Sequence, residues 1–293
     1  MLFLKSTTLL LVSSVSAHVI RSQAPRAAKP GSSITGNWCG NAQWDAPKHL
    51  MVRSGQDEVA AKQAFTNSSI VIDTYVHIVT NSTKVEDGFV SDQTIAEQLT
   101  VLNARFAPSR FTFKLKGLTR TVSKRWAVRP NEADDLAMRK KLRKGDYKTL
   151  NLYFQTDSAE GIYGLCYYPR EVKPNSDEFF VDGCNMQHIT LPGGAAAGYN
   201  NGITTVHEVG HWLGLMHTFD GGCEGEGDFV DDTPAEAEAN FECTIGRNSC
   251  PGQEGFDSIH NYMAYTSDAC RSNFTPGQTA RMHAQWSAYR SKS

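Results

Sequence analysis

The segment HEVGHWLGLMH, residues 207–217, constrains the fold of this chain more strongly than any other part of its sequence. Residues four positions apart lie on the same face of an α-helix, so His207 and His211 should present their imidazoles in the same direction. Gly214 can adopt a positive φ angle, which would end the helix and let the chain turn back. The segment therefore predicts a helix and a turn that bring His217 next to the first two imidazoles.

Three converging imidazoles predict a metal site, and neutral imidazole nitrogen suits zinc in particular. A catalytic zinc has three protein ligands and one position for water, and Glu208 lies where a general base for that water belongs. The alternative is a surface helix with solvated histidines. A cleft wall is favoured instead by the apolar neighbours Val206, Val209, Trp212, Leu213 and Leu215. We therefore expect one catalytic zinc ion on His207, His211 and His217, with Glu208 as a catalytic residue.

The spacing HExxHxxGxxH resembles that of the metzincin metallopeptidases. In these enzymes a methionine turn lies beneath the metal, and HNYMAYT (260–266) offers Met263 for that place. The blocks HTFDGGC, DTPAEAE, CPG and FTPGQTARM extend the likeness. With them, about residues 65–290 resemble the pappalysin family, especially its secreted fungal members and its ulilysin-like bacterial members. A metzincin of another family is the alternative, and the late cysteine blocks argue against it.

This resemblance implies a secreted zinc endopeptidase that hydrolyses protein or peptide substrates with a metal-activated water. It implies an α/β or α+β fold with a mixed twisted sheet, a zinc-binding helix, a methionine turn and a C-terminal helix. Tyr265 matches the tyrosine that steadies the oxyanion in several metzincins, and simple packing is its alternative role. A non-catalytic secreted binding protein with a structural zinc is the alternative function. Structural zinc, however, normally has four protein ligands.

The seven cysteines comprise one near the start, Cys39, and six after residue 160. The resemblance implies the pairs Cys223–Cys250 and Cys243–Cys270, which leaves Cys166 and Cys184 to pair with each other. It also implies latency, because in some pappalysins a propeptide cysteine occupies the open zinc position. Cys39 in WCGN matches that element, although the surrounding residues depart from the usual basic context. A free or intermolecular thiol is the alternative.

The N-terminal residues predict a secreted precursor. Residues 1–17 contain a lysine, an apolar run and a small-residue end, which is typical of a signal peptide. Residues 18–65 should be a propeptide or linker, and residues 66–293 the catalytic domain. The formal net charge of −2 gives no basic field for nucleic acid or membrane. With the predicted signal peptide, we expect an extracellular protein, and we expect it to be a monomer. Glycosylation sequons are present at Asn67, Asn81 and Asn273.

Hydrophobic periodicity predicts strands and helices in alternation. We expect strands at 69–80, 110–118, 149–156 and 185–192, the last of them near a sheet edge, and helices at 91–107, 132–145 and 276–290. Ser91 should cap the first helix, and Thr275 with Gln278 should form a capping box for the last one. This order favours a mostly parallel sheet, whereas residues 218–274 should have little regular structure.

The loop at 219–236 is acidic, with carboxylates at Asp220, Glu224, Glu226, Asp228, Asp231 and Asp232. Carboxylate and carbonyl oxygens suit calcium, and relatives carry calcium in this region. A solvated acidic loop is the alternative, because the spacing matches no defined calcium loop.

Overall fold

The computed structural model describes residues 39–40, 69–159 and 161–292. The predicted signal peptide and nearly all of the predicted propeptide lie outside the described residues, so their boundaries stay predictions. Asn67 lies outside them as well. Among the described residues, no helix has the length and apolar character needed to cross a membrane.

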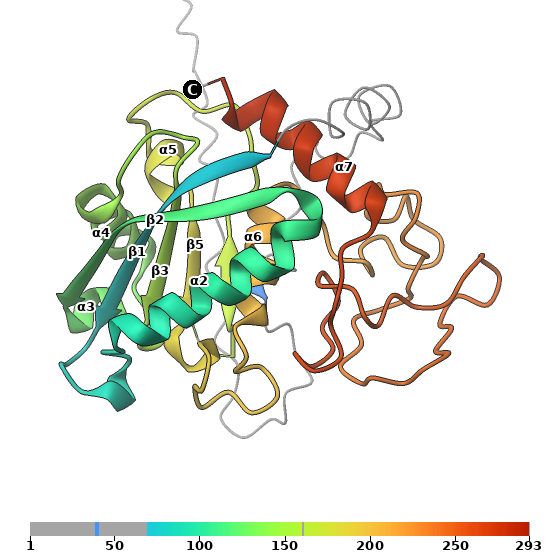
Figure 1. Cartoon of the computed structure of the whole chain (residues 1–293), viewed down its shortest axis with the longest axis horizontal. Coiled ribbons are helices and arrows are strands. Elements are labelled where there is room, and N and C mark those ends of the chain that lie inside the picture. Colours follow the sequence, from blue (N-terminus) through green and yellow to red (C-terminus); the bar gives the residue numbers. More distant parts are fainter. Residues whose placement is uncertain (1–38, 41–68, 160, 293) are drawn as a thin grey trace, which may run out of the picture.

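A five-stranded mixed sheet forms the centre of the molecule (Figure 1). Its strands are β1 (Ile70–Thr80), β2 (Phe111–Val122), β3 (Leu150–Gln155), β4 (Gly164–Cys166) and β5 (Cys184–Gln187), arranged in the order β2-β1-β3-β5-β4. All neighbouring pairs are parallel except β4 with β5, which is antiparallel. The predicted mostly parallel sheet is confirmed. The last predicted strand is shorter than expected, because the chain enters a 3-10 turn at His188–Thr190.

The predicted helices form at the expected places, together with two short helices, at Lys124–Ala127 and Asp177–Val181, that the sequence does not predict. They are α2 (Asp92–Phe106), α3 (Lys124–Ala127), α4 (Glu132–Leu142), α5 (Asp177–Val181), α6 (Ile203–Trp212) and α7 (Pro276–Gln285), which continues as a π-helical turn at Trp286–Arg290. Ser91 caps α2 by accepting a hydrogen bond from the Thr94 N–H, and Thr275 with Gln278 forms the capping box of α7. Helix α4 ends before the predicted Gly145, because Arg143 has left the helical conformation with ψ of 138°.

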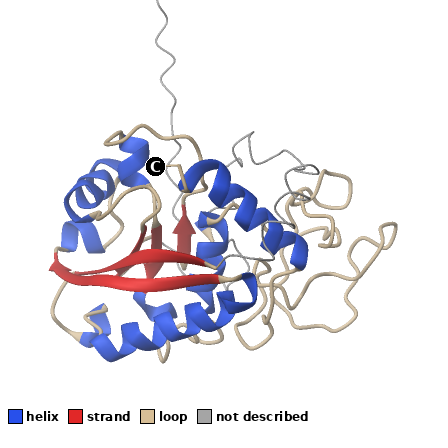
Figure 2. Cartoon of the chain, turned by 45° about the horizontal axis from the view of Figure 1, so that its top comes forward, coloured by secondary structure: helices blue, strands red, loops and turns tan. Residues whose placement is uncertain are grey.

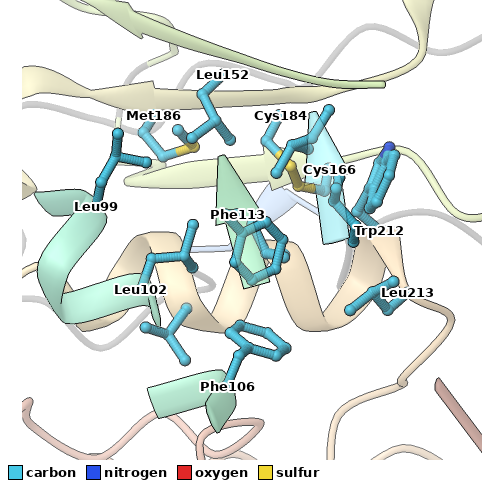
Figure 3. Packing of buried hydrophobic residues seen from close by; sticks show 14 of the residues in the cluster. Leu99, Leu102, Phe106, Phe113, Leu152, Cys166, Cys184, Met186, Trp212 and Leu213 are labelled. Carbon is cyan, nitrogen blue, oxygen red and sulfur yellow. A yellow bond between two sulfur atoms is a disulfide. The ribbon is translucent and has the colours of Figure 1, made fainter. Parts of the chain in front are cut away.

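Helices cover both faces of the sheet (Figure 2). On one face, α2 and the end of α6 pack against the strands around a core drawn in Figure 3, which includes Leu99, Leu102, Phe106, Phe113, Leu152, Met186, Trp212 and Leu213. On the other face, Val79 and Tyr153 pack against Ala127 and Met138 from α3 and α4. The inward alternation along β1 and β3 supplies apolar side chains to both layers. Helix α6 is buried along its whole length as a result.

Residues 213–275 contain no helix or strand, as the sequence predicts. Two disulfides, Cys223–Cys250 and Cys243–Cys270, cross-link this stretch, and both predicted pairs are confirmed. The third disulfide joins Cys166 of β4 to Cys184 of β5. Disulfides constrain the unfolded chain and can replace a hydrophobic core in a segment of this kind.

Candidate active site

Three buried imidazoles converge at the end of α6. The Nε2 atom of His211 lies 3.1 Å from Nε2 of His207 and 3.1 Å from Nε2 of His217. The first two project from one face of α6, and the third arrives after a turn at Gly214, whose φ is 95°. A Cβ at Gly214 would lie 2.5 Å from Cγ of Gln285 in α7, so both backbone angle and space require glycine there.

Hydrogen bonds define which nitrogen of each ring carries the proton. His207 Nδ1 donates to the carbonyl of Tyr262 at 2.7 Å, and His211 Nδ1 donates to the carbonyl of Leu215 at 2.8 Å. A carbonyl oxygen only accepts, so the Nε2 atoms of these two rings carry lone pairs. For the third ring, Nδ1 of His217 lies 3.4 Å from the Asp220 carboxylate.

The imidazole cluster fits a metal cation. Burial, followed by the neighbouring imidazoles, lowers the pKa of His207 and His211 well below the usual value, so neither ring is protonated at neutral pH. Unprotonated Nε2 lone pairs that face one another repel unless a cation lies between them. With Cys39, the three histidines offer four ligand atoms that all lie within 4.8 Å of one another. This donor set suits zinc.

Glu208 is a fully buried carboxylate next to this cluster. Burial raises its pKa to about 8, while the neighbouring Cys39 side chain, Arg271 and the Cys166 backbone act in the opposite direction. Neither carboxylate oxygen has a hydrogen-bond partner of normal geometry among the described residues. A fully buried carboxylate is costly, so its retention beside the imidazoles points to a ligand that it must meet.

Tyr265 places its hydroxyl at the same centre. Its oxygen lies 3.2 Å from Nε2 of His217 and 3.5 Å from the carbonyl oxygen of Cys39. Burial raises the pKa of this phenol well above its usual value, so the hydroxyl keeps its proton and can donate. The ring also packs against Phe219 and Phe241, at centroid distances of 4.8 and 5.7 Å. Both roles considered for Tyr265 are therefore compatible with its position.

Met263 lies directly against α6, as a methionine turn requires. Its side chain is fully buried, and a Cβ added at Gly210 of α6 would lie 2.5 Å from its Sδ atom. The helix and the turn are thus in close contact, and the same turn supplies the Tyr262 carbonyl that orients His207.

Cys39 reaches the imidazole cluster from the far N-terminal side of the chain. Its Sγ atom lies 3.4 Å from Nε2 of His211, and its side chain is fully buried. Its backbone forms a single parallel bridge with Gly164 of β4. The segment therefore lies along the sheet edge beside the site and points its thiol at the imidazoles.

The carboxylates of the acidic loop at 219–236 lie in different surroundings. Asp220 accepts a hydrogen bond from the His217 N–H at 3.0 Å, and Asp232 accepts from the Gly277 N–H at 2.8 Å at the start of α7. Asp228 is buried beside a cavity of about 230 Å³ that Glu226 and Asp231 also line. Its Oδ2 atom has no hydrogen-bond partner among the described residues, and burial raises its pKa to about 7.

Sequence reasoning missed several groups that shape the site. The carbonyls of Tyr262 and Leu215 belong to the backbone, so the residue types at these positions do not indicate that they bind the imidazoles. Gly164 and Cys166 lie on β4, a strand of three residues that is too short to show a hydrophobic period. Asp220 was noted only as a calcium candidate, although its position three residues after His217 could have indicated a contact.

The mixed sheet, the buried helix and the methionine turn beneath three converging imidazoles define the metzincin class of metallopeptidases. Residues 134–287 match the family model described as Pregnancy-associated plasma protein-A, which is the pappalysin family. The chain belongs to this family of metallopeptidases.

Relatives of this chain include fungal proteins of similar length. An extracellular metalloprotease of Pyricularia oryzae is 50% identical over 232 residues, which cover 79% of each chain. One of Neurospora crassa is 44% identical over 258 residues, covering 85% of this chain and 89% of its own. Among solved structures, mature mirolysin of Tannerella forsythia in complex with a cleaved peptide is 29% identical. Its match has a TM-score of 0.60 and covers 74% of this chain and 91% of its own. A promirolysin mutant from the same organism shares the fold at 24% identity, with a TM-score of 0.66 and coverage of 86% and 94%.

Proposed function

We propose that this protein is a secreted zinc endopeptidase, made as a latent precursor, that hydrolyses peptide bonds in protein or peptide substrates. The observation that carries the proposal is the convergence of three imidazoles beside a fully buried carboxylate. The extracellular metalloproteases among its relatives support secretion, and so do three disulfides, which persist in oxidising compartments. The peptide held by mature mirolysin supports the substrate class.

The imidazoles of His207, His211 and His217 would hold one zinc ion, which when bound supplies a Lewis acid that activates water and polarises a carbonyl. Glu208 accepts the proton of the attacking water and later delivers it to the leaving amine. Its raised pKa suits a group that must take up and release a proton near neutral pH. Tyr265, kept protonated by burial, donates a hydrogen bond to the carbonyl oxygen as negative charge develops there.

The alternative is a non-catalytic binding protein with a structural zinc. Cys39 favours it in one respect, because with the three histidines it completes a set of four protein ligands. Glu208 argues against it, because a structural site has no use for a fully buried carboxylate beside the metal.

A Glu208→Gln variant separates the two functions. We expect it to keep one zinc per chain and to lose nearly all hydrolysis of casein, because the amide cannot accept the proton. Glu238→Gln, at an exposed position, is the matched control and should keep wild-type turnover. Substantial casein hydrolysis by Glu208→Gln, or loss of zinc together with activity, would contradict the catalytic role.

Latency rests on the Cys39 thiol. Thiolate is a good zinc ligand, and Sγ lies beside His211 where a fourth ligand would exclude water. Precursor carrying Glu208→Gln cannot cleave itself, so its metal shell can be measured by X-ray absorption. We expect a zinc–sulfur distance of about 2.3 Å that disappears in the Cys39→Ser, Glu208→Gln double variant. A shell of nitrogen and oxygen alone in the intact reduced precursor would exclude this mechanism.

We also propose calcium for the cavity beside Asp228. Its unpartnered Oδ2 atom and the carboxylates of Glu226 and Asp231 offer the hard oxygen ligands that calcium prefers. Millimolar calcium should raise the melting temperature of the wild type and leave that of Asp228→Asn unchanged. An equal rise in both proteins would place the calcium elsewhere.

The remaining expectations concern partners. A formal net charge of −2 gives no reason to expect nucleic acid or membrane as partners. We also propose that the protein is a monomer.

A further inference from the structure

The edge strand β4 lies against the Glu208 carboxylate. A Cβ added at Gly164 would lie 2.5 Å from both Cγ and Oε1 of Glu208, closer than real Cβ atoms approach other atoms. Gly164 is not among the glycines with positive φ, so its backbone would accept alanine. Glycine is therefore needed at this position to leave room for the Glu208 carboxylate, and not for the conformation of the strand.

Strand β4 is weakly held by hydrogen bonds alone. It has three residues, and among the named strands it neighbours β5, through Gly164 with Met186, Leu165 with Asn185 and Cys166 with Cys184. A pairing of this length gives little stability in itself. The last of the three pairs is also the disulfide, so a covalent bond fixes β4 to β5 at this register (Figure 3).

Both cysteines of this disulfide lie close to Glu208. The Sγ atom of Cys184 lies 3.9 Å from the Glu208 carbonyl oxygen, and the Cys166 backbone faces the carboxylate closely enough to influence it. The disulfide thus joins the edge strand to the sheet and lies against Glu208, and all three residues are buried.

The outer side of β4 is covered by Cys39, which bridges to Gly164. If the Cys39 segment leaves on maturation, β4 keeps its pairing with β5, its packing against α6 and the disulfide. The need for the disulfide is then greatest in the mature protein.

We propose that Gly164 and the Cys166–Cys184 disulfide are positioning residues for Glu208, which set the place of its carboxylate in the mature enzyme. This inference rests on the proposed function, because it assigns Glu208 a role in turnover. Glycine at position 164 leaves room for the Glu208 side chain. The disulfide holds β4 against β5, and so fixes the distance between Gly164 and Glu208. A buried carboxylate displaced by about 1 Å can lose about 100-fold in rate.

Gly164→Ala in the mature enzyme tests the first part. We expect kcat on a peptide substrate to fall by about 100-fold, with KM changed less than about threefold and zinc still at one per chain, while overpacking lowers the melting temperature by a few degrees. Gly117→Ala is the matched control, because it adds the same methyl group on the opposite edge strand, where the Cβ would meet Tyr75 at 3.0 Å. A kcat for Gly164→Ala within about twofold of wild type, or loss of zinc, would overturn the proposal.

Cys166→Ala with Cys184→Ala tests the second part. Measured well below its melting temperature, this variant should lose at least about tenfold in kcat and keep its zinc. Adding Gly164→Ala should then cost less than it does in the wild type, because both changes act on one carboxylate. Removing Cys243–Cys270 is the matched control and should lower the melting temperature with little effect on kcat. Equal kcat losses from the two disulfides would overturn the proposal.

The outcomes separate this inference from the proposed function. If Glu208→Gln is inactive and Gly164→Ala is fully active, the proposed function stands and the positioning role fails. If Glu208→Gln is itself active, the proposed function fails first.

Discussion

Arg290 fastens the C-terminal end of the chain to the end of α6. Its side chain is fully buried, and it pairs with Asp182 through two contacts of 3.0 and 3.2 Å. Its Nε atom donates to the Trp212 carbonyl at 2.9 Å, and the guanidinium carbon lies 3.6 Å from the centroid of the Trp212 ring. Arg290→Met should therefore remove a charge pair, a helix-end hydrogen bond and a cation–π contact together, while keeping an apolar side chain of similar length.

The expected cost follows from the burial of both charges. Removing one partner of a buried pair costs about 3–5 kcal/mol, because the other charge is left without compensation. Asp182 keeps Arg143 at 3.4 Å and the Trp212 indole N–H at 3.2 Å, which places the cost near the lower end, at about 3 kcal/mol. In a domain of this size 1 kcal/mol corresponds to about 2–4 °C, so the melting temperature should fall by about 6–12 °C.

Thermal unfolding followed by circular dichroism measures this fall, and the Glu208→Gln background prevents self-cleavage during the scan. Arg125→Met is the matched control, because Arg125 also pairs with an aspartate, Asp134, but is solvated at the surface. It should leave the melting temperature essentially unchanged. A fall of less than about 2 °C for Arg290→Met, or equal falls for both variants, would refute the reasoning.

Three further predictions concern the acidic loop, the imidazole cluster and the methionine turn. Burial raises the pKa of Asp228 from 3.8 to about 7, so the folded state holds a proton that the unfolded state has lost. Calcium-free protein should therefore lose stability as pH rises across this window, by up to about 4 kcal/mol, and then level off, whereas Asp228→Asn should show no such slope in urea unfolding. Asp220→Asn should weaken zinc binding by about 10–100-fold in competition with a chromogenic chelator, because the carboxylate that faces the third imidazole is lost; unchanged affinity would remove Asp220 from the metal centre. Met263→Ala should cost about 2–5 kcal/mol in urea unfolding, because it leaves a cavity beneath α6; a cost below about 1 kcal/mol would show that the site collapses around it.

The sequence predicts best the elements that are long enough to show a regular hydrophobic pattern and that begin or end at a recognisable capping or turn residue. Helix α2 begins after Ser91, and α7 begins with the capping box of Thr275 and Gln278, as their side chains indicate. The helix that carries His207 and His211, and its end near Gly214, follow from the spacing and from the one residue type that readily tolerates positive φ. Strand β4 escaped prediction because three residues cannot display a period.

The sequence by itself determined which imidazoles converge. His207 and His211 share a helix face, and the turn at Gly214 brings His217 back to them, all within eleven residues. Only the tertiary structure decided what surrounds them. The Tyr262 carbonyl that orients His207 is 55 residues away, and Cys39 is 172 residues from His211. Such contacts depend on how the sheet, α6 and the disulfide-linked loops pack, and on the burial that removes water from Glu208. Burial and long-range packing are properties of the whole fold, so no local pattern encodes them.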